Sequence, residues 1–117
     1  MSLIRYTRKV RGTSVHMHWF KVRGEHSISY PPPIIEESGP EIGDVFLYQY
    51  KQTFQAWYCD TQEGRLWNPI REGSTRKLPG LSSSRVFIIT PTGTPSWVVP
   101  DTVNRQYKHL KKEDRLP

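Results

Sequence analysis

The chain has 117 residues, of which 35% are hydrophobic and 12% aromatic, and it carries a net charge of +6. This length is enough for one hydrophobic core and too short for two, so we expect a single domain over residues 1–117. The charged fraction of 24% is ordinary for a folded protein and argues against extensive disorder.

Three features of the sequence predict the compartment. The longest apolar run is Val86–Ile89, well short of the roughly 18 residues that span a membrane, so no membrane partner is expected. The N-terminus lacks the apolar segment of a signal peptide. Cys59 is the only cysteine, and a chain without an internal disulfide is typical of a reducing compartment. We therefore expect an intracellular protein of the cytoplasm or nucleus.

The first predicted element is a β-hairpin within residues 1–24. Residues 3–10 and 15–22 alternate in the manner of strands, and Gly12–Ser14 between them has the composition of a turn. The segment holds six Lys or Arg residues and no acid. One face of its first strand is consequently strongly basic.

Residues 25–43 are predicted to form a connector. Tyr30–Pro33 contains three prolines, which favour an extended polyproline II conformation. Five acidic residues lie at positions 25–44, and they can neutralise the basic hairpin if the connector folds back onto it. The connector could be a mobile linker or an ordered strap. A hairpin tethered in this way could also exchange between two copies and give a homodimer.

Residues 44–100 show the pattern of a β-meander. Apolar and aromatic runs separated by turn residues predict five strands, at 45–50, 54–60, 65–70, 85–90 and 95–99. Residues 101–112 are predicted to form a helix that Asp101 can cap. Its apolar stripe consists of Val103, Tyr107 and Leu110. The expected fold class is mainly β, an antiparallel meander or small open barrel with an N-terminal hairpin and one short C-terminal helix.

The basic and aromatic residues favour a nucleic-acid-binding module. Lys and Arg side chains contact phosphates, and neighbouring aromatic rings can stack on bases. We therefore predict a non-catalytic module that binds nucleic acid, or an acidic protein partner, through a basic-aromatic surface. If the basic segments do not share a face, their charge serves only solvation. The candidate residues are Arg5, Arg8, Lys9, Arg11, Trp19, Phe20, Lys21, Arg23, Arg76 and Lys77.

An alternative is a protein-interaction module built on Trp57, Tyr58 and Trp67. Trp57 and Trp67 would face each other across a hairpin that turns at Gly64, and an open aromatic pair of this kind binds proline-rich peptides or methylated lysine. Pro31–Pro33 could instead be the ligand of a partner. The competing interpretation is that these rings form the core of a small β domain that has few leucines.

A second alternative is a metal-dependent enzyme that uses His16 and His18. On a strand, the two imidazoles share a side and lie about 6.5–7 Å apart, which suits a metal if a third ligand is supplied. The sequence shows no catalytic constellation to support this. Cys59 is followed by Asp60, which would raise the pKa of the thiol, and no glycine-rich phosphate loop is present. The sequence therefore favours a protein without enzymatic activity and without a cofactor.

Overall fold

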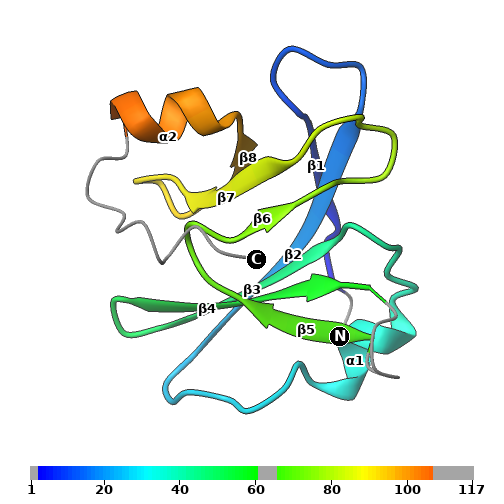
Figure 1. Cartoon of the computed structure of the whole chain (residues 1–117). Helices are drawn as coiled ribbons and strands as arrows, with labels where there is room; N and C mark the ends of the chain where they lie inside the picture. Colours follow the sequence, from blue (N-terminus) through cyan, green and yellow to red (C-terminus); the bar gives the residue numbers. More distant parts are fainter. Residues whose placement is uncertain (1–2, 61–65, 107–117) are drawn as a thin grey trace. The chain divides into compact units, whose positions relative to one another are not determined.

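The structure is a computed structural model that describes residues 3–60 and 66–106 (Figure 1). The fold is mainly β, as predicted, and within these residues the strands form two open sheets. One sheet has five strands in the order β1-β2-β3-β4-β5, and the other has three in the order β6-β7-β8. The N-terminal hairpin of β1 (Tyr6–Lys9) and β2 (His16–Gly24) and the short C-terminal helix are present. The strands that the sequence assigns to one meander are divided between the two sheets.

Contacts within the chain divide it into two compact units. The first unit consists of the residues up to Arg8 and of Met17–Ile70, and the second consists of Lys9–His16 and of the residues from Arg71 onward. The end of the N-terminal hairpin thus groups with the second unit, although its strands continue into the first. The expectation that residues 1–117 act as a single domain stays a prediction.

The sheet of the first unit has an antiparallel and a parallel part. β3 (Val45–Tyr50), β4 (Thr53–Cys59) and β5 (Trp67–Ile70) form an antiparallel meander. The predicted turn at Gly64 lies outside the described residues. β2 pairs with β3 in parallel, and parallel neighbours need a crossover connection rather than a tight turn. Residues 25–44 supply this connection, which explains why so long a segment interrupts the strand pattern.

The connector is an ordered strap on one face of this sheet, fastened by side chains of the strands. The amide of Gln55 donates from Nε2 to the carbonyl of Ile28 at 2.8 Å, and its Oε1 accepts the Ile28 N–H at 2.9 Å. The hydroxyl of Tyr48 donates to the carbonyl of His26 at 2.6 Å. These bonds satisfy strap backbone groups that would otherwise lack partners beside an apolar core.

Within the strap, the short helix α1 (Pro33–Glu37) forms where the sequence predicts only extended chain. Pro32 before it has the expected polyproline conformation, with φ −66° and ψ 154°. A proline suits the first turn of a helix because its missing N–H would have no partner there. The helix turns Ile35 into the core, where its side chain is fully buried.

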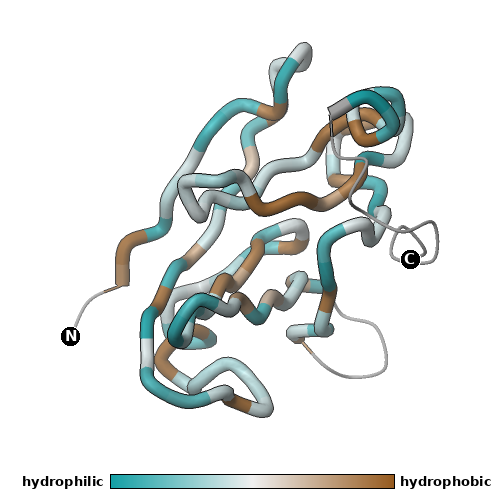
Figure 2. The backbone as a smooth tube through the Cα atoms, turned by 90° about the vertical axis from the view of Figure 1, so that its left-hand side faces the viewer, coloured by the Kyte–Doolittle hydropathy of each residue, from teal (hydrophilic) through white to brown (hydrophobic). Residues whose placement is uncertain are grey.

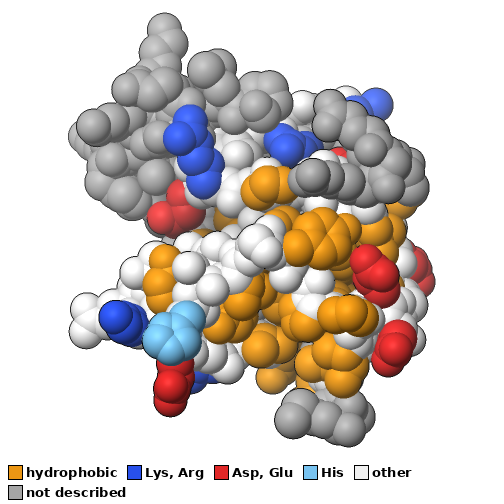
Figure 3. All heavy atoms as spheres, turned by 90° about the horizontal axis from the view of Figure 1, so that it is seen from below, with side chains coloured by type: hydrophobic (Ala, Val, Ile, Leu, Met, Phe, Trp, Pro, Cys, Tyr) orange, Lys and Arg blue, Asp and Glu red, His pale blue; other side chains and the backbone are white. Residues whose placement is uncertain are grey.

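An aromatic core lies between the strap and the sheet. Its buried members are Phe20, Ile35, Phe46, Tyr48, Trp57, Cys59 and Trp67. The ring of Phe46 lies 5.7 Å from that of Trp57 and 6.2 Å from that of Trp67, between centroids. Seen from below, much of the surface around the strap is also hydrophobic (Figure 3). Partly buried residues that pack against the core are Leu3, Val22, Ile28, Tyr30, Ile34, Tyr50 and Leu66.

The second unit is built on a three-stranded antiparallel sheet. β7 (Arg85–Ile89) is its central strand and lies between β6 (Thr75–Arg76) and β8 (Pro95–Val98). The continuous apolar run of β7 can be followed in Figure 2. A central strand is buried on both faces, and this is why its sequence does not alternate.

One helix, α2 (Pro100–Gln106), follows the second sheet and contacts β7. It buries Val103, the first member of the predicted apolar stripe. Residues 107–112 of the predicted helix, with Tyr107 and Leu110, lie outside the described residues.

Candidate nucleic-acid interface

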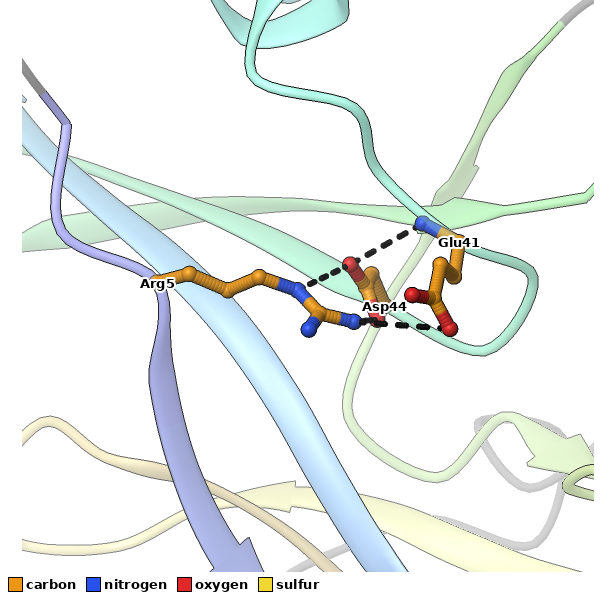
Figure 4. A network of polar contacts seen from close by, with 3 residues as sticks. All are labelled: Arg5, Glu41 and Asp44. Atoms are coloured by element: carbon orange, nitrogen blue, oxygen red, sulfur yellow. Dashed lines mark hydrogen bonds and ion pairs between the residues drawn. The ribbon is translucent and has the colours of Figure 1, made fainter.

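Arg5, the first predicted phosphate ligand, is held in an internal ion pair (Figure 4). Its Nε donates to Oδ2 of Asp44 at 3.0 Å, and its Nη2 donates to Oδ1 at 2.9 Å. The Asp44 side chain is 3% exposed, and its Oδ2 also accepts the backbone N–H of Glu41 at 3.1 Å. Hydrogen bonding to the carboxylate favours the charged guanidinium and raises the pKa of Arg5. The guanidinium of Arg5 is therefore used in an ion pair within the fold, and this corrects the prediction that Arg5 binds phosphate.

The acidic connector neutralises part of the basic hairpin. Asp44 neutralises the charge of Arg5 through this ion pair. Glu41 adds a weaker contact, because its Oε2 lies 4.0 Å from Nη2 of Arg5 and its side chain is 76% exposed. Arg8, on exposed β1, forms no ion pair among the residues that the structure describes. Neutralisation of the hairpin is thus partial.

Trp19 and Phe20, which the sequence predicts to stack on bases, are buried instead. Phe20 is 1% exposed in the aromatic core of the first unit. Trp19 is 8% exposed, and its ring stacks on that of Tyr6 with 5.5 Å between centroids. Both belong to β2, an internal strand between β1 and β3, and internal strands bury apolar side chains on both faces. The assignment of these two rings to a binding surface is corrected accordingly.

Lys21 and Arg23 also lie on β2. Lys21 is half-buried, with Nζ 5.7 Å from the centroid of the Phe54 ring. Arg23 is exposed, and its Nη2 donates to Oε1 of Gln49 at 3.2 Å. Lys21 thus contributes to packing, whereas Arg23 keeps most of its guanidinium in solvent.

The excess of positive charge among the described residues lies in the second unit. Over 3–60 and 66–106, the first unit holds five Lys or Arg against six Asp or Glu, and the second holds seven against two. The acidic connector therefore balances the part of the basic N-terminal segment that belongs to the first unit. Lys9 and Arg11 of that segment belong to the second unit and add to its excess.

Three arginines from distant parts of the sequence converge in the second unit. β6 and β7 are antiparallel and place Arg76 directly opposite Arg85. Side chains in such a register leave the same face of the sheet, with Cβ atoms about 5 Å apart. Nη1 of Arg85 donates to the backbone carbonyl of Arg11 at 3.3 Å, which brings the hairpin end to the start of β7. We call Arg11, Arg76 and Arg85 the arginine cluster; the exposed Lys9 and Lys77 are its close neighbours in sequence.

The hairpin end that carries Arg11 is shaped by its own backbone. The N–H of Val10 donates to the carbonyl of Val15 at 2.8 Å, and the N–H of Thr13 donates to the carbonyl of Val10 at 3.0 Å. Gly12 has φ +79°, a left-handed conformation that a side chain would disfavour. This turn holds the exposed side chain of Arg11 at the tip of the hairpin.

Arg85 is a member of the cluster that the set predicted from sequence does not contain. One feature of the sequence could have indicated Arg85: Arg76 and Arg85 stand at the two ends of one polar loop. When the two ends of that loop pair as strands, the two arginines lie opposite each other. β6 has only two residues, too few for an alternating pattern to reveal it as a strand.

The aromatic residues of the peptide-binding alternative are part of the core. Trp57 and Tyr58 are each 4% exposed, and Trp67 is 0% exposed. Trp67 lies opposite Cys59 in the register of β4 and β5, and not opposite Trp57. Pro31, in the segment considered as a ligand for a partner, is buried as well. The structure therefore places these side chains as the core interpretation expects and leaves no open aromatic pair here.

The histidines and the cysteine offer little chemistry. His16 is exposed and His18 is half-buried, and no group of three His, Cys, Asp or Glu side chains within the described ranges could hold a metal ion. Burial, helped by the carboxylates of Asp44 and Asp60, raises the pKa of the Cys59 thiol to about 12. A neutral thiol of this kind is a poor nucleophile and a poor metal ligand.

Comparison with known proteins adds no relative. No protein-family model matches the chain, and neither a curated protein nor a solved structure is significantly similar to it. Over residues 3–60 and 66–106, no helix combines the length and apolar character needed to cross a bilayer.

Proposed function

We propose that the chain is a non-catalytic module that binds nucleic acid through the basic surface of its second unit. This surface consists of Lys9, Arg11, Arg76, Lys77 and Arg85. The observation that carries the proposal is the separation of charge among the described residues, with seven Lys or Arg against two acids in the second unit and near balance in the first. A concentrated positive field attracts phosphates and gains free energy from counterion release.

The described acidic side chains of the second unit support this proposal, because both lie at residues outside the proposed surface. Glu72 accepts the N–H of Ile89 through Oε1 at 2.7 Å, and Asp101 lies in the first turn of α2. Among the described residues, no ion pair is formed by Lys9, Arg11, Lys77 or Arg85. These four cations are therefore available to phosphates.

The proposed mode of binding relies on phosphate contacts rather than on base stacking. Trp19 and Phe20 are buried in the first unit, so they add no rings to the surface. Phosphate contacts position a protein on nucleic acid but carry no sequence information. We therefore expect weak sequence preference. Phosphate contacts from these four available cations predict that log K falls with log salt with a slope of up to about −3.6 for duplex DNA.

The test is a fluorescence-anisotropy titration of labelled single- and double-stranded DNA and RNA at two salt concentrations. The double variant Lys9→Glu/Lys77→Glu should weaken binding at low salt at least tenfold. Its matched control is Arg23→Glu/Lys51→Glu, which changes net charge equally but on the first unit, and which should weaken binding less than about threefold. Equal losses in the two variants, or no binding of any nucleic acid at low salt, would refute the proposal.

A further inference from the structure

Among the described strands, β1 is the sheet edge most open to an added strand. The other edge strands are β5, β6 and β8. β5 contains Pro69 and β8 begins with Pro95, and a proline opposes further pairing because it has no N–H. β6 is only two residues long. β1 contains no proline, and all four of its residues are exposed.

The backbone of β1 presents hydrogen-bonding groups along its outer side. The N–H of Val10 donates to the carbonyl of Val15 at 2.8 Å, and this bond sets the register of the hairpin. Alternate residues of an antiparallel pair bond to the partner strand. Tyr6 and Arg8 therefore bond toward β2, whereas Thr7 directs its N–H and carbonyl away from it. β1 has no second neighbour among the described strands that could pair with these groups of Thr7.

β1 is held in place on its inner side. Arg5, directly before the strand, donates two hydrogen bonds to Asp44. The ring of Tyr6 stacks on that of Trp19 with 5.5 Å between centroids and is still 41% exposed. The strand is therefore ordered before a partner arrives, and an ordered edge costs less conformational entropy to extend.

The exposed side chains of β1 define the chemistry of its partner. Arg8 and Tyr6 share one side of the strand, and Arg8 forms no ion pair among the described residues. On a paired strand, an acidic residue opposite Arg8 is stabilising, and an apolar residue opposite Tyr6 packs against its ring. Pairing with a second copy of β1 is disfavoured, because residues 3–24 contain no acid and like charges would be brought together.

We propose that β1 binds an extended acidic segment of a partner protein by strand addition. The backbone of Thr7 donates to and accepts from the added strand. Arg8 and Tyr6 select an acidic and an apolar residue two positions apart in that strand. These residues lie outside the basic surface proposed for nucleic acid, so this proposal is independent of nucleic-acid binding.

The first experiment measures amide hydrogen exchange of the full chain by nuclear magnetic resonance. In the free chain, the N–H of Thr7 should exchange faster than that of Arg8, because it lies on the outer side of the strand. The probe is the peptide acetyl-Thr-Glu-Thr-Val-Thr-Glu-Thr-amide, whose symmetric sequence suits either strand direction. For a dissociation constant near 0.5 mM, about 2 mM peptide should slow exchange at Thr7 about fivefold.

A backbone variant tests the strand contact by fluorescence anisotropy of the labelled peptide. Thr7→Pro removes the outward N–H and should weaken binding about tenfold, whereas Thr7→Val keeps this N–H and should bind as the wild type does. An edge strand tolerates proline where the N–H faces outward, so Thr7→Pro should keep a normal circular dichroism spectrum.

A charge variant keeps the test decisive if Thr7→Pro does not fold. Arg8→Glu should weaken binding about fivefold, and a peptide with lysine in place of glutamate should bind this variant more tightly than it binds the wild type. The matched control, Arg23→Glu, changes another exposed arginine of the first unit and should bind the original peptide within about twofold of the wild type.

The proposal is overturned if the N–H of Thr7 is already protected in the free chain, because the chain would then cover its own edge. Protection that rises with protein concentration, together with a dimer in sedimentation, would assign the edge to a second copy. Equal binding by folded Thr7→Pro and Thr7→Val would refute strand addition, and no preference of Arg8→Glu for the lysine peptide would refute the acidic partner. Protection of Thr7 by single-stranded RNA but not by the peptide would assign the edge to nucleic acid.

Discussion

Replacement of Arg5 tests whether a buried ion pair fastens the N-terminal segment to the first sheet. In Arg5→Met, the Asp44 carboxylate loses two hydrogen bonds and keeps the one from the Glu41 N–H. Removal of one partner from a buried pair costs about 3–5 kcal/mol, because the remaining charge is uncompensated. The Arg5 side chain is 29% exposed, so water replaces part of the loss. We expect the free energy of unfolding to fall by about 2–3 kcal/mol.

The assay is urea unfolding followed by tryptophan fluorescence, since three of the four tryptophans, Trp19, Trp57 and Trp67, belong to the first unit. Arg5→Met, Asp44→Asn and the double variant complete a double-mutant cycle, for which we expect a coupling energy of about 2 kcal/mol. Two controls should each change stability by less than about 0.5 kcal/mol. They are Arg8→Met, on an exposed strand, and Glu41→Gln, whose side chain is 76% exposed.

A coupling energy below about 0.5 kcal/mol would refute the reasoning, because the pair would then behave as an ordinary surface salt bridge. A loss in Arg8→Met as large as that in Arg5→Met would refute it as well. Either result would mean that the N-terminal segment is held by packing rather than by the carboxylate.

Three further predictions concern the first unit. The Cys59 thiol should not react with a disulfide reagent in the native state at about pH 8, and should react at once in urea. Because the fold raises its pKa to about 12, the thiol's contribution to stability is complete below the pKa of the unfolded thiol and is lost as the pH rises toward 12. This decline in stability should be smaller in Cys59→Ala. Gln55→Leu removes both hydrogen bonds to Ile28 and should cost about 1–2 kcal/mol, with faster amide hydrogen exchange in the strap; unchanged exchange at Ile28 would contradict this role. Gly24→Ala would place a methyl group against the hydroxyl of Tyr48 and should cost about 1–3 kcal/mol in urea unfolding, with part of the loss regained when Tyr48→Phe is added; no regain would mean that the clash lies elsewhere.

The local elements of the fold could be predicted because their signals are local. The strand predicted at 45–50 coincides with β3, and the one at 85–90 differs from β7 by one residue. The predicted start of the C-terminal helix also differs from that of α2 by one residue. Alternation, apolar runs and turn residues depend only on neighbours in the chain, so they can be read without knowledge of the sheets.

The pairing of the strands could not be predicted in the same way. The parallel contact of β2 with β3 joins residues separated by the whole strap, and no neighbour signal specifies it. Helix α1 is a similar case, because its five residues are too few to be stable without the burial of Ile35 in the core.

For the candidate site, the sequence by itself determined the total charge and the segments that carry it, because charge adds residue by residue. The tertiary structure decided which cations remain available. Arg5 was removed from the set by Asp44, and the rings of Trp19 and Phe20 were removed by burial. Arg85 was added because β6 and β7 set it opposite Arg76. Whether a charge is paired or free depends on contacts between residues far apart in the chain, and only the folded arrangement supplies these.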